Sequence, residues 1–496
     1  MPDLSYLLWA LLILPAVAAG ACLLLRSIRA ALLWVIAVVA VASAATAVAA
    51  WTVFTGGPIE AGAGWLYLDA LSAYHLVLLH AVFLSSSIYA YSYFRREALF
   101  GPARARRFGS LWLGSLAAMT LVLVSNNLGM AWVGVEATTL LTAFLICTHV
   151  SASSLEATWK YLIMCSVGVA FAFIGTLLVA ASAGASHLAT GDALLWTHLR
   201  AVAAHLDPAT LKMGFIFLLV GYGTKMGLVP MHNWLPDAHS QAPAPVSAVF
   251  SGFLLNTALY CILRYVPLVE TATGGSRWAL DLLVGFGVLS ILIAGAFIVF
   301  QRDAKRLLAY SSVEHMGVIA LGVGLGGFGT FAAMFHVMNH SLCKPLAFFS
   351  AGRLGQMYGT HELSCLAGSA RGAPLWGRGF LVSLLALIGV APFAIFMSEF
   401  QILKAAADRG AFAIMALFLA GTGIVFIGAL RHAIRAAWDS PLRQPTPEQP
   451  SLVDRALVYA PLAMLLVLGL WMPEFLRGAI NHAAAVIQGL PAKGGF

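Results

Sequence analysis

Long runs of apolar residues follow one another along almost the whole chain, and this repetition restricts the fold more than any other feature. A helix needs about 20 apolar residues to cross the hydrocarbon core of a bilayer. Of the 496 residues, 61% are hydrophobic and only 10% are charged, whereas a soluble domain carries about 25% charged residues. We therefore predict an all-α polytopic membrane protein. Soluble enzymes, disordered chains and disulfide-stapled secreted domains are excluded.

About 14 of these runs are long enough to span the membrane. They occupy residues 5–25, 30–53, 69–92, 109–126, 128–148, 160–182, 212–229, 246–268, 278–300, 308–327, 329–351, 379–401, 410–430 and 453–473. Runs seven and twelve are interrupted, the first by Gly227 and Pro230 and the second by Gly389 and Pro392. Two matched broken helices five spans apart indicate inverted repeats around a transport site near the membrane midplane.

The positions of the interrupted runs predict the domain organisation. We expect a single membrane domain over residues 1–496. Within it, residues 109–268 would form the first five-helix repeat and residues 278–430 the second, inverted repeat. The spans in residues 1–92 and 453–473 would flank the two repeats.

Lysine and arginine residues indicate the orientation of the chain. Loops after odd-numbered runs hold 17 of the 28 basic residues, and loops on the other side hold 7. Because basic loops stay in the cytoplasm, we predict a multi-pass protein of the cell inner (plasma) membrane with both termini on the outer face. These loops account for the net charge of +8, so we predict no nucleic-acid partner.

The remaining four basic residues fall inside predicted spans and are the main functional signal. They are Lys160, Lys225, Arg264 and Lys344. A charge at the bilayer centre costs at least about 2.5–3.5 kcal/mol, so such residues face a bundle interior or a wet cavity. We expect Lys225 to titrate easily beside its helix break, because a lysine removed from water releases its proton more readily. Glu136, in the fifth run, is the candidate counter-charge and proton carrier. Alternatively, Glu136 is a neutral acid that bonds a neighbouring helix, and Lys225 belongs to a structural ion pair.

A polar stripe marks the eleventh run, and an acidic residue marks the twelfth. His336, His340 and Lys344 are spaced four apart, which places them on one helix face and favours a proton relay over simple helix–helix hydrogen bonding. The HxxxH spacing also suits a metal, but Lys344 continues the stripe and no HExxH motif is present, so we predict no metal. Glu399 follows the second break and is the candidate output acid, unless it only lies near a span end.

Two further groups leave their roles open. Lys305 is explained by the positive-inside rule alone, whereas Glu314 and His315 enter the tenth run and could extend the relay. Glu156 and Lys160 are spaced for an i, i+4 ion pair at the start of the sixth run, and a simple boundary pair is as plausible as a functional one.

Five segments of this chain, in order, carry a resemblance to a known family. They are WVGVEATTLL, GYGTKMGLVPMHNWLPDAHSQAPAPVSA, QRDAKRLLAYSSVEHMG, FHVMNHSLCKPLAFF and APFAIFMSEF. They resemble the antiporter-like, proton-translocating subunits of respiratory complex I, the multisubunit sodium/proton antiporters and the membrane-bound nickel–iron hydrogenases. FSGFLLNTALYCILRY and AYSSVEHMG look most like the hydrogenase-4 component F type, and the resemblance covers nearly the whole chain.

The resemblance implies roles for the candidate residues along a hydrated polar axis in the membrane plane. Glu136 matches the fifth-span glutamate, Lys225 the lysine of the broken seventh helix, and Glu399 the acidic residue of the broken twelfth helix. His336, His340 and Lys344 match the polar stripe of the eleventh span. One departure is Asn256, which stands where many relatives have a titratable residue in the eighth span. Water would have to bridge that position.

The function we predict is proton translocation coupled to redox chemistry in partner subunits. The chain itself is expected to hold no cofactor, because its six cysteines show no cluster-binding spacing and no nucleotide motif is convincing. Its expected partners are other membrane and peripheral subunits, membrane lipid and translocated protons, with sodium as a possible coupling ion. Two alternatives remain at this point: the cation-conducting partner of an inorganic-carbon uptake complex, and a sodium/proton antiporter subunit.

Overall fold

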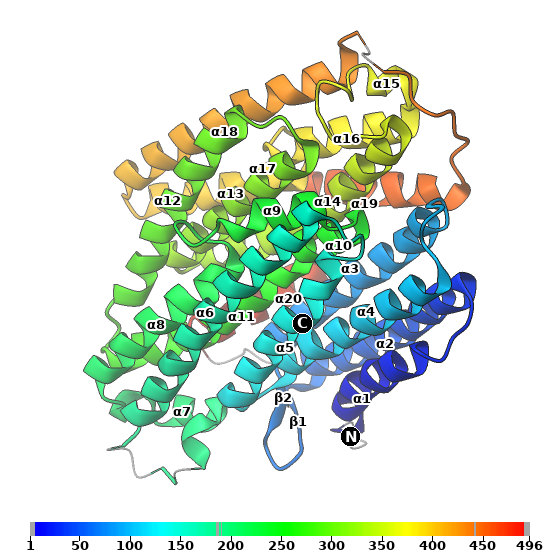
Figure 1. The fold of residues 1–496 in the computed structure, drawn as a ribbon. Coiled ribbons are helices and arrows are strands. Elements are labelled where there is room, and N and C mark those ends of the chain that lie inside the picture. Colours follow the sequence, from blue (N-terminus) through cyan, green and yellow to red (C-terminus); the bar gives the residue numbers. More distant parts are fainter. Residues whose placement is uncertain (1–4, 185–187, 190, 441–442, 491–496) are drawn as a thin grey trace.

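A computed structural model describes residues 5–184, 188–189, 191–440 and 443–490. It is a bundle of long helices that run side by side, with a small β-hairpin and the short helix α7 at one end and α15 at the other (Figure 1). The hairpin pairs β1 (Ile59–Ala61) with β2 (Leu66–Leu68) in antiparallel register. The prediction of an all-α polytopic protein is confirmed.

The helices follow in chain order. They are α1 (Ser5–Cys22), α2 (Ile28–Gly56), α3 (Ala70–Phe94), α4 (Pro102–Val124), α5 (Leu128–Ile146), α6 (Ala152–Ser182), α7 (Trp196–Ala201), α8 (Pro208–Met226), α9 (Trp234–Gln241), α10 (Ala244–Val249), α11 (Leu255–Ala272), α12 (Trp278–Val299), α13 (Ala304–Leu325), α14 (Phe328–Tyr358), α15 (Ser369–Gly372), α16 (Pro374–Leu387), α17 (Ala394–Asp408), α18 (Phe412–Trp438), α19 (Leu452–Leu470) and α20 (Glu474–Ile487). Short 3-10 turns cover Asp192–Leu194 and Ala203–His205, and one π-helical turn, Phe250–Leu254, joins α10 to α11.

Eleven of the described helical segments are long and apolar enough to cross a membrane. The other predicted runs fall on α8, on α14 and on the pair α16–α17, where polar residues or short helices interrupt the apolar pattern. Each predicted run therefore coincides with a helix or a pair of helices. The total of about 14 crossings and the pairing of two inverted repeats stay predictions.

Fully buried and largely exposed helices occupy different layers of the bundle. The α10–α11 segment and α13 are buried along their whole apolar windows, whereas α18 and α19 are only 28% buried. The outer helices expose large apolar side chains, among them Ile427 and Leu470. A surface of this kind suits lipid, and it leaves the interior of the bundle for the polar residues that lipid would exclude.

Both predicted helix breaks are present, and they have the same local geometry. Helix α8 ends before Gly227 (φ +83°), and α16 ends just before Gly389 (φ +70°), a left-handed conformation that favours glycine. At each end a backbone N–H, from Leu228 or Val390, closes back onto the carbonyl five residues earlier. A proline follows three residues after each glycine, and the chain resumes as α9 or α17.

The first break leaves helix carbonyls and loop amides without their usual partners, and neighbouring side chains satisfy them. Trp234 Nε1 donates to the carbonyl of Thr224 (2.8 Å), and Ser290 Oγ of α12 accepts from the Val229 amide (3.0 Å). Irregular backbone at membrane depth is stable only where protein or water satisfies it in this way. The break is thus held in place by the surrounding bundle.

Candidate functional site

Lys225 lies in the last turn of α8, directly before the first break, and is buried. Its Nζ donates to Thr139 Oγ1 (2.5 Å) and to the carbonyl of Val135 (3.3 Å), both on α5. Tyr161 on α6 lies next to it, with its hydroxyl 3.4 Å from Nζ. All three contacts are neutral oxygens, so the ammonium group is solvated by the protein without being paired to a carboxylate.

The direct ion pair predicted between Glu136 and Lys225 is absent, although both residues are described. Val135 and Thr139 share the face of α5 that meets Lys225, and Glu136 is turned about 100° away from Val135 around the helix. Its Oε1 instead accepts from Ser166 Oγ on α6 (3.1 Å), and its Oε2 is buried with no hydrogen-bond partner among the residues that the structure describes. Glu136 therefore acts on Lys225 only through its charge, at a distance.

The polar stripe of α14 is buried at the centre of the bundle. His336 Nε2 hydrogen-bonds His315 Nδ1 of α13 (3.0 Å), and His336 Nδ1 faces Ser398 Oγ of α17 (2.9 Å). The ring of His340 lies 5.3 Å from that of His315, and neither of its nitrogens has a hydrogen-bond partner among the described residues. The structure thus brings the stripe together with His315, the residue proposed to extend it.

Lys344 continues the stripe one turn after His340. Its Nζ donates to the carbonyl of Leu308 in α13 (2.9 Å). Glu314 of α13 is buried and close enough for its charge to act on Lys344, and its Oε2 lies 3.5 Å from His315 Nδ1. An acid, an imidazole and an amine therefore lie in sequence along the α13–α14 interface.

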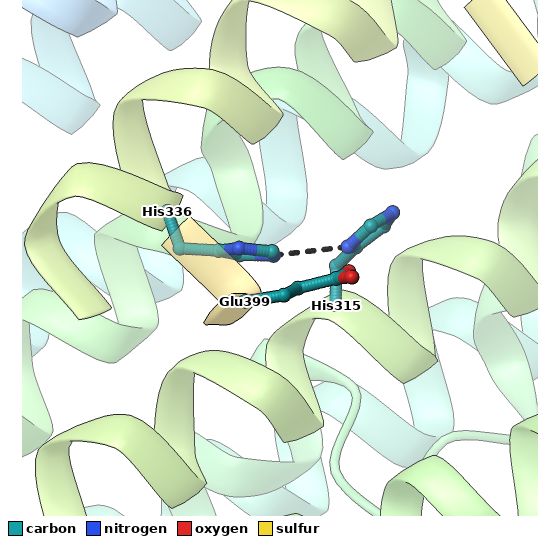
Figure 2. A group of neighbouring side chains, drawn as sticks. All are labelled: His315, His336 and Glu399. Carbon is teal, nitrogen blue, oxygen red and sulfur yellow. Dashed lines mark hydrogen bonds between the residues drawn. The ribbon is translucent and has the colours of Figure 1, made fainter. Parts of the chain in front are cut away.

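Glu399 joins this group from the second broken helix. Ligand atoms of His315, His336 and Glu399 all lie within 4.8 Å of one another, and Figure 2 shows the three side chains converging. The carboxylate also contacts Gly389, where α16 ends. Glu399 thus connects the α14 stripe to the second break.

Asn256 lies just after the π-helical turn, at the position where many relatives have a titratable residue. Its Nδ2 donates to the carbonyl of Gly252 (3.2 Å) and to Ser341 Oγ of α14 (3.0 Å). Its Oδ1 is buried and has no partner among the described residues. π-Helical turns often lie at functional sites, and this one leaves an unpaired oxygen in the centre of the bundle.

His239 is a central residue that the sequence analysis did not single out. It lies on α9 after the first break, stacked on Phe348 with ring centroids 4.9 Å apart. Within the described part of the chain, neither buried ring nitrogen has a hydrogen-bond partner, and the charges of Lys344 and Lys305 act on the ring. His239 lies in WLPDAHS, which is part of a family motif quoted above, and this position within the motif could have identified it from the sequence.

Lys305, which the positive-inside rule alone would account for, is buried at the start of α13. Its Nζ donates to the carbonyls of Ser240 (2.9 Å) and Ala242 (2.5 Å), in the segment that follows His239. Lys305 therefore binds the C-terminal end of α9, the helix that follows the first break. It places a second positive charge near His239.

Two other predicted residues have structural partners. Arg264 forms a buried bidentate pair with Asp69 (2.6 and 2.7 Å), supported by Ser72 and Tyr260, a pairing the sequence analysis missed. Lys160 pairs with Glu156 (2.7 Å), as the i, i+4 spacing predicts, and also with Asp237 (3.1 Å).

Asp237 is half-buried in the first turn of α9 and links three segments. Burial disfavours its carboxylate, but hydrogen bonds from Arg306 and Lys160 outweigh that effect, so the pKa of Asp237 lies below its ordinary value. The aspartate is therefore ionised at neutral pH. It ties the end of the broken helix to the starts of α6 and α13.

Comparison with known proteins gives the family of this arrangement. The membrane-subunit family described as NADH:quinone oxidoreductase/Mrp antiporter matches residues 125–425, which include both broken helices and the whole polar row. The chain belongs to this family. It is a multi-pass membrane subunit of the antiporter-like type.

Individual relatives agree with this assignment. The chain is 40% identical to a hydrogenase-4 component F homolog of Methylacidiphilum infernorum over 367 residues, 73% of this chain and 76% of the relative. It is 28% identical to NADH-quinone oxidoreductase subunit N of Desulforudis audaxviator, over 84% of each chain. Its fold matches a subunit of the archaeal membrane-bound sulfane sulfur reductase with a TM-score of 0.86, at 24% identity over 97% of each chain.

Proposed function

We propose that this chain is a proton-translocating antiporter-like subunit that couples redox chemistry in partner subunits to ion transport. The observation that carries the proposal is the row of buried titratable side chains between the two broken helices. In order, the row contains Lys225, His239, Lys344, Glu314, His340, His315, His336 and Glu399, all of them buried except Glu399, which is half-buried. Titratable residues inside a membrane bundle cost free energy to bury, and they usually mark ion or proton pathways.

The two ends of the row would exchange protons with different partners. We propose Glu136 and Lys225 as the input, with the Glu136 charge acting on Lys225 through space. A change in that distance would alter how tightly Lys225 holds its proton and so drive the proton onward. Glu399 would be the output acid, since it lies at the far break beside His336.

Between Lys225 and His239 the row contains no titratable side chain that could carry a proton. The ring of Phe250 lies between them, 6.1 Å from the ring of Tyr161 and 6.1 Å from that of His239. Neither Phe250 nor Asn256 can carry a titrating proton. We therefore propose that water bridges this segment, and that the buried Oδ1 of Asn256, which has no partner among the described residues, holds water elsewhere along the row.

We propose that the protein lies in the cell inner (plasma) membrane with both termini on the outer face. Contacts between loops support the alternating topology behind this orientation. Arg96 after α3, Arg353 in the last turns of α14 and Glu448 after α18 are linked to one another. On the opposite side, Arg277 and Arg409 both donate to carbonyls at the end of α13.

Purification of the native complex through a tag on this chain, followed by mass spectrometry, tests the coupling to redox partners. We expect iron–sulfur subunits together with hydrogenase-like or quinone-reducing subunits. A zinc-dependent hydratase as the sole partner would overturn the proposal in favour of inorganic-carbon uptake. Partners consisting only of other antiporter subunits, with sodium-dependent activity, would overturn it in favour of sodium/proton exchange.

A further inference from the structure

His315, His336 and Glu399 converge from α13, α14 and α17 in an arrangement that suits more than proton transfer. The two histidine nitrogens that face each other are 3.0 Å apart, and the carboxylate completes a group within 4.8 Å (Figure 2). Two imidazoles and one carboxylate form a common ligand set for zinc, with one coordination position left open.

The spacing of these atoms is close to what a zinc ion requires. Zinc binds histidine nitrogen at about 2.0–2.1 Å, so two ligand atoms of a tetrahedral site lie roughly 3.3 Å apart. The observed 3.0 Å between His315 Nδ1 and His336 Nε2 needs only a small adjustment. Glu399 has a longer way to move, and its side chain has the rotatable bonds to do so.

The surroundings favour a divalent cation over an unligated cluster. His336 Nδ1 is fixed by Ser398 Oγ (2.9 Å), which aims Nε2 at His315, as outer-shell partners do in zinc sites. Two carboxylates, Glu314 and Glu399, lie at the cluster, against one nearby ammonium group, that of Lys344. Glu399 also lines a hollow of about 280 Å³ between α17 and α18.

We propose that His315, His336 and Glu399 form a reversible zinc site at which the bound ion blocks the relay. The metal would replace the proton shared by the two imidazoles, because the nitrogens that bind zinc cannot also carry a proton. The binding of zinc by these residues is inferred from the distances between their ligand atoms. The block of transport rests on the proposed function.

The binding itself is tested on the purified complex with zinc chloride. We expect the zinc K-edge spectrum of the wild-type complex to show imidazole and carboxylate ligands. Glu399→Gln and His336→Asn should each weaken zinc binding at least tenfold in a titration, after folding is checked by size-exclusion chromatography. Because the wild-type spectrum needs no variant, misfolding of either variant leaves the test intact.

Surface histidines provide the matched control, since exposed histidines also attract zinc. His149 lies 3.0 Å from Glu97 and His198 lies 3.5 Å from Asp192, both near the surface. We expect His149→Asn and His198→Asn to leave the affinity unchanged. If these variants abolish binding while Glu399→Gln does not, or if the spectrum contains no imidazole, the site is wrong.

Proton pumping in the same preparations separates this inference from the proposed function. We expect zinc to inhibit pumping by the wild-type complex and EDTA to restore it. Zinc that binds at this cluster and leaves pumping unchanged would contradict a relay through His315 and His336. Failure of zinc to bind, in a complex whose pumping is lost in His336→Asn, would overturn the zinc site and leave the relay standing.

Discussion

Buried charges in this protein occupy two distinct environments. Arg264 is paired bidentately with Asp69, and neither charge is left alone. Lys225, Lys305 and Lys344 contact neutral oxygens and, among the described residues, form no ion pair. A lysine in such a setting can lose its proton without stranding a partner charge, whereas an arginine does not deprotonate in proteins. We therefore expect Arg264 to serve stability, and we propose that Lys225 and Lys344 serve proton transfer.

Removal of one partner of the Arg264–Asp69 pair should destabilise the protein. We expect Asp69→Asn to lower the free energy of unfolding by about 3–5 kcal/mol, because an unpaired guanidinium remains buried. Thermal unfolding of the detergent-solubilised complex measures the effect. The double variant Asp69→Asn with Arg264→Met should recover part of the loss, and a single variant as stable as the wild type would contradict the assignment.

Asn256 tests whether water completes the row. Asn256→Leu removes the unpaired Oδ1 and the hydrogen bond to Ser341, so we expect the pumping rate to fall at least tenfold. Asn256→His offers a titratable group in a similar volume and should retain pumping. Proton uptake by reconstituted vesicles is the measurement. Normal pumping in Asn256→Leu would place the proton path elsewhere.

At the scale of helices, local sequence signals predicted the elements, and the packing between elements decided the contacts. Apolar length and the glycine–proline interruptions are properties of one segment, so the spans and both breaks could be predicted. The direction of Glu136 depends on how α5 packs against α6 and α8, and the pair Asp69–Arg264 joins residues far apart in sequence. The π-helical turn Phe250–Leu254 has no sequence signal that we recognised.

The helix breaks should depend on their glycines. Gly227→Ala forces a side chain into a left-handed conformation, at a cost of about 1–2 kcal/mol, and its Cβ would lie 2.7 Å from Leu235. We expect a lower melting temperature and slower pumping. Gly423→Ala on the outer helix α18 meets no atom within 4 Å and is the matched control. Equal melting temperatures for the two variants would contradict this role of the break.

At the scale of the whole molecule, the bundle encloses a polar row within an apolar shell. The fully buried helices α11 and α13 and the stripe of α14 lie inside, and the apolar faces of α18 and α19 lie outside. An enclosed row of this kind has its ends at the two broken helices, where neighbouring subunits or water would supply and receive protons. The account therefore depends most on the residue at the start of the row.

Proton pumping by the complex that carries Lys225→Ala is the most direct test of this account. Lys404→Ala is the matched control, because Lys404 is exposed and pairs only with Asp408 among the described residues. The account predicts that Lys225→Ala abolishes pumping in proteoliposomes while the complex still assembles, and that Lys404→Ala pumps normally. Pumping at the wild-type rate in an assembled Lys225→Ala complex would contradict it.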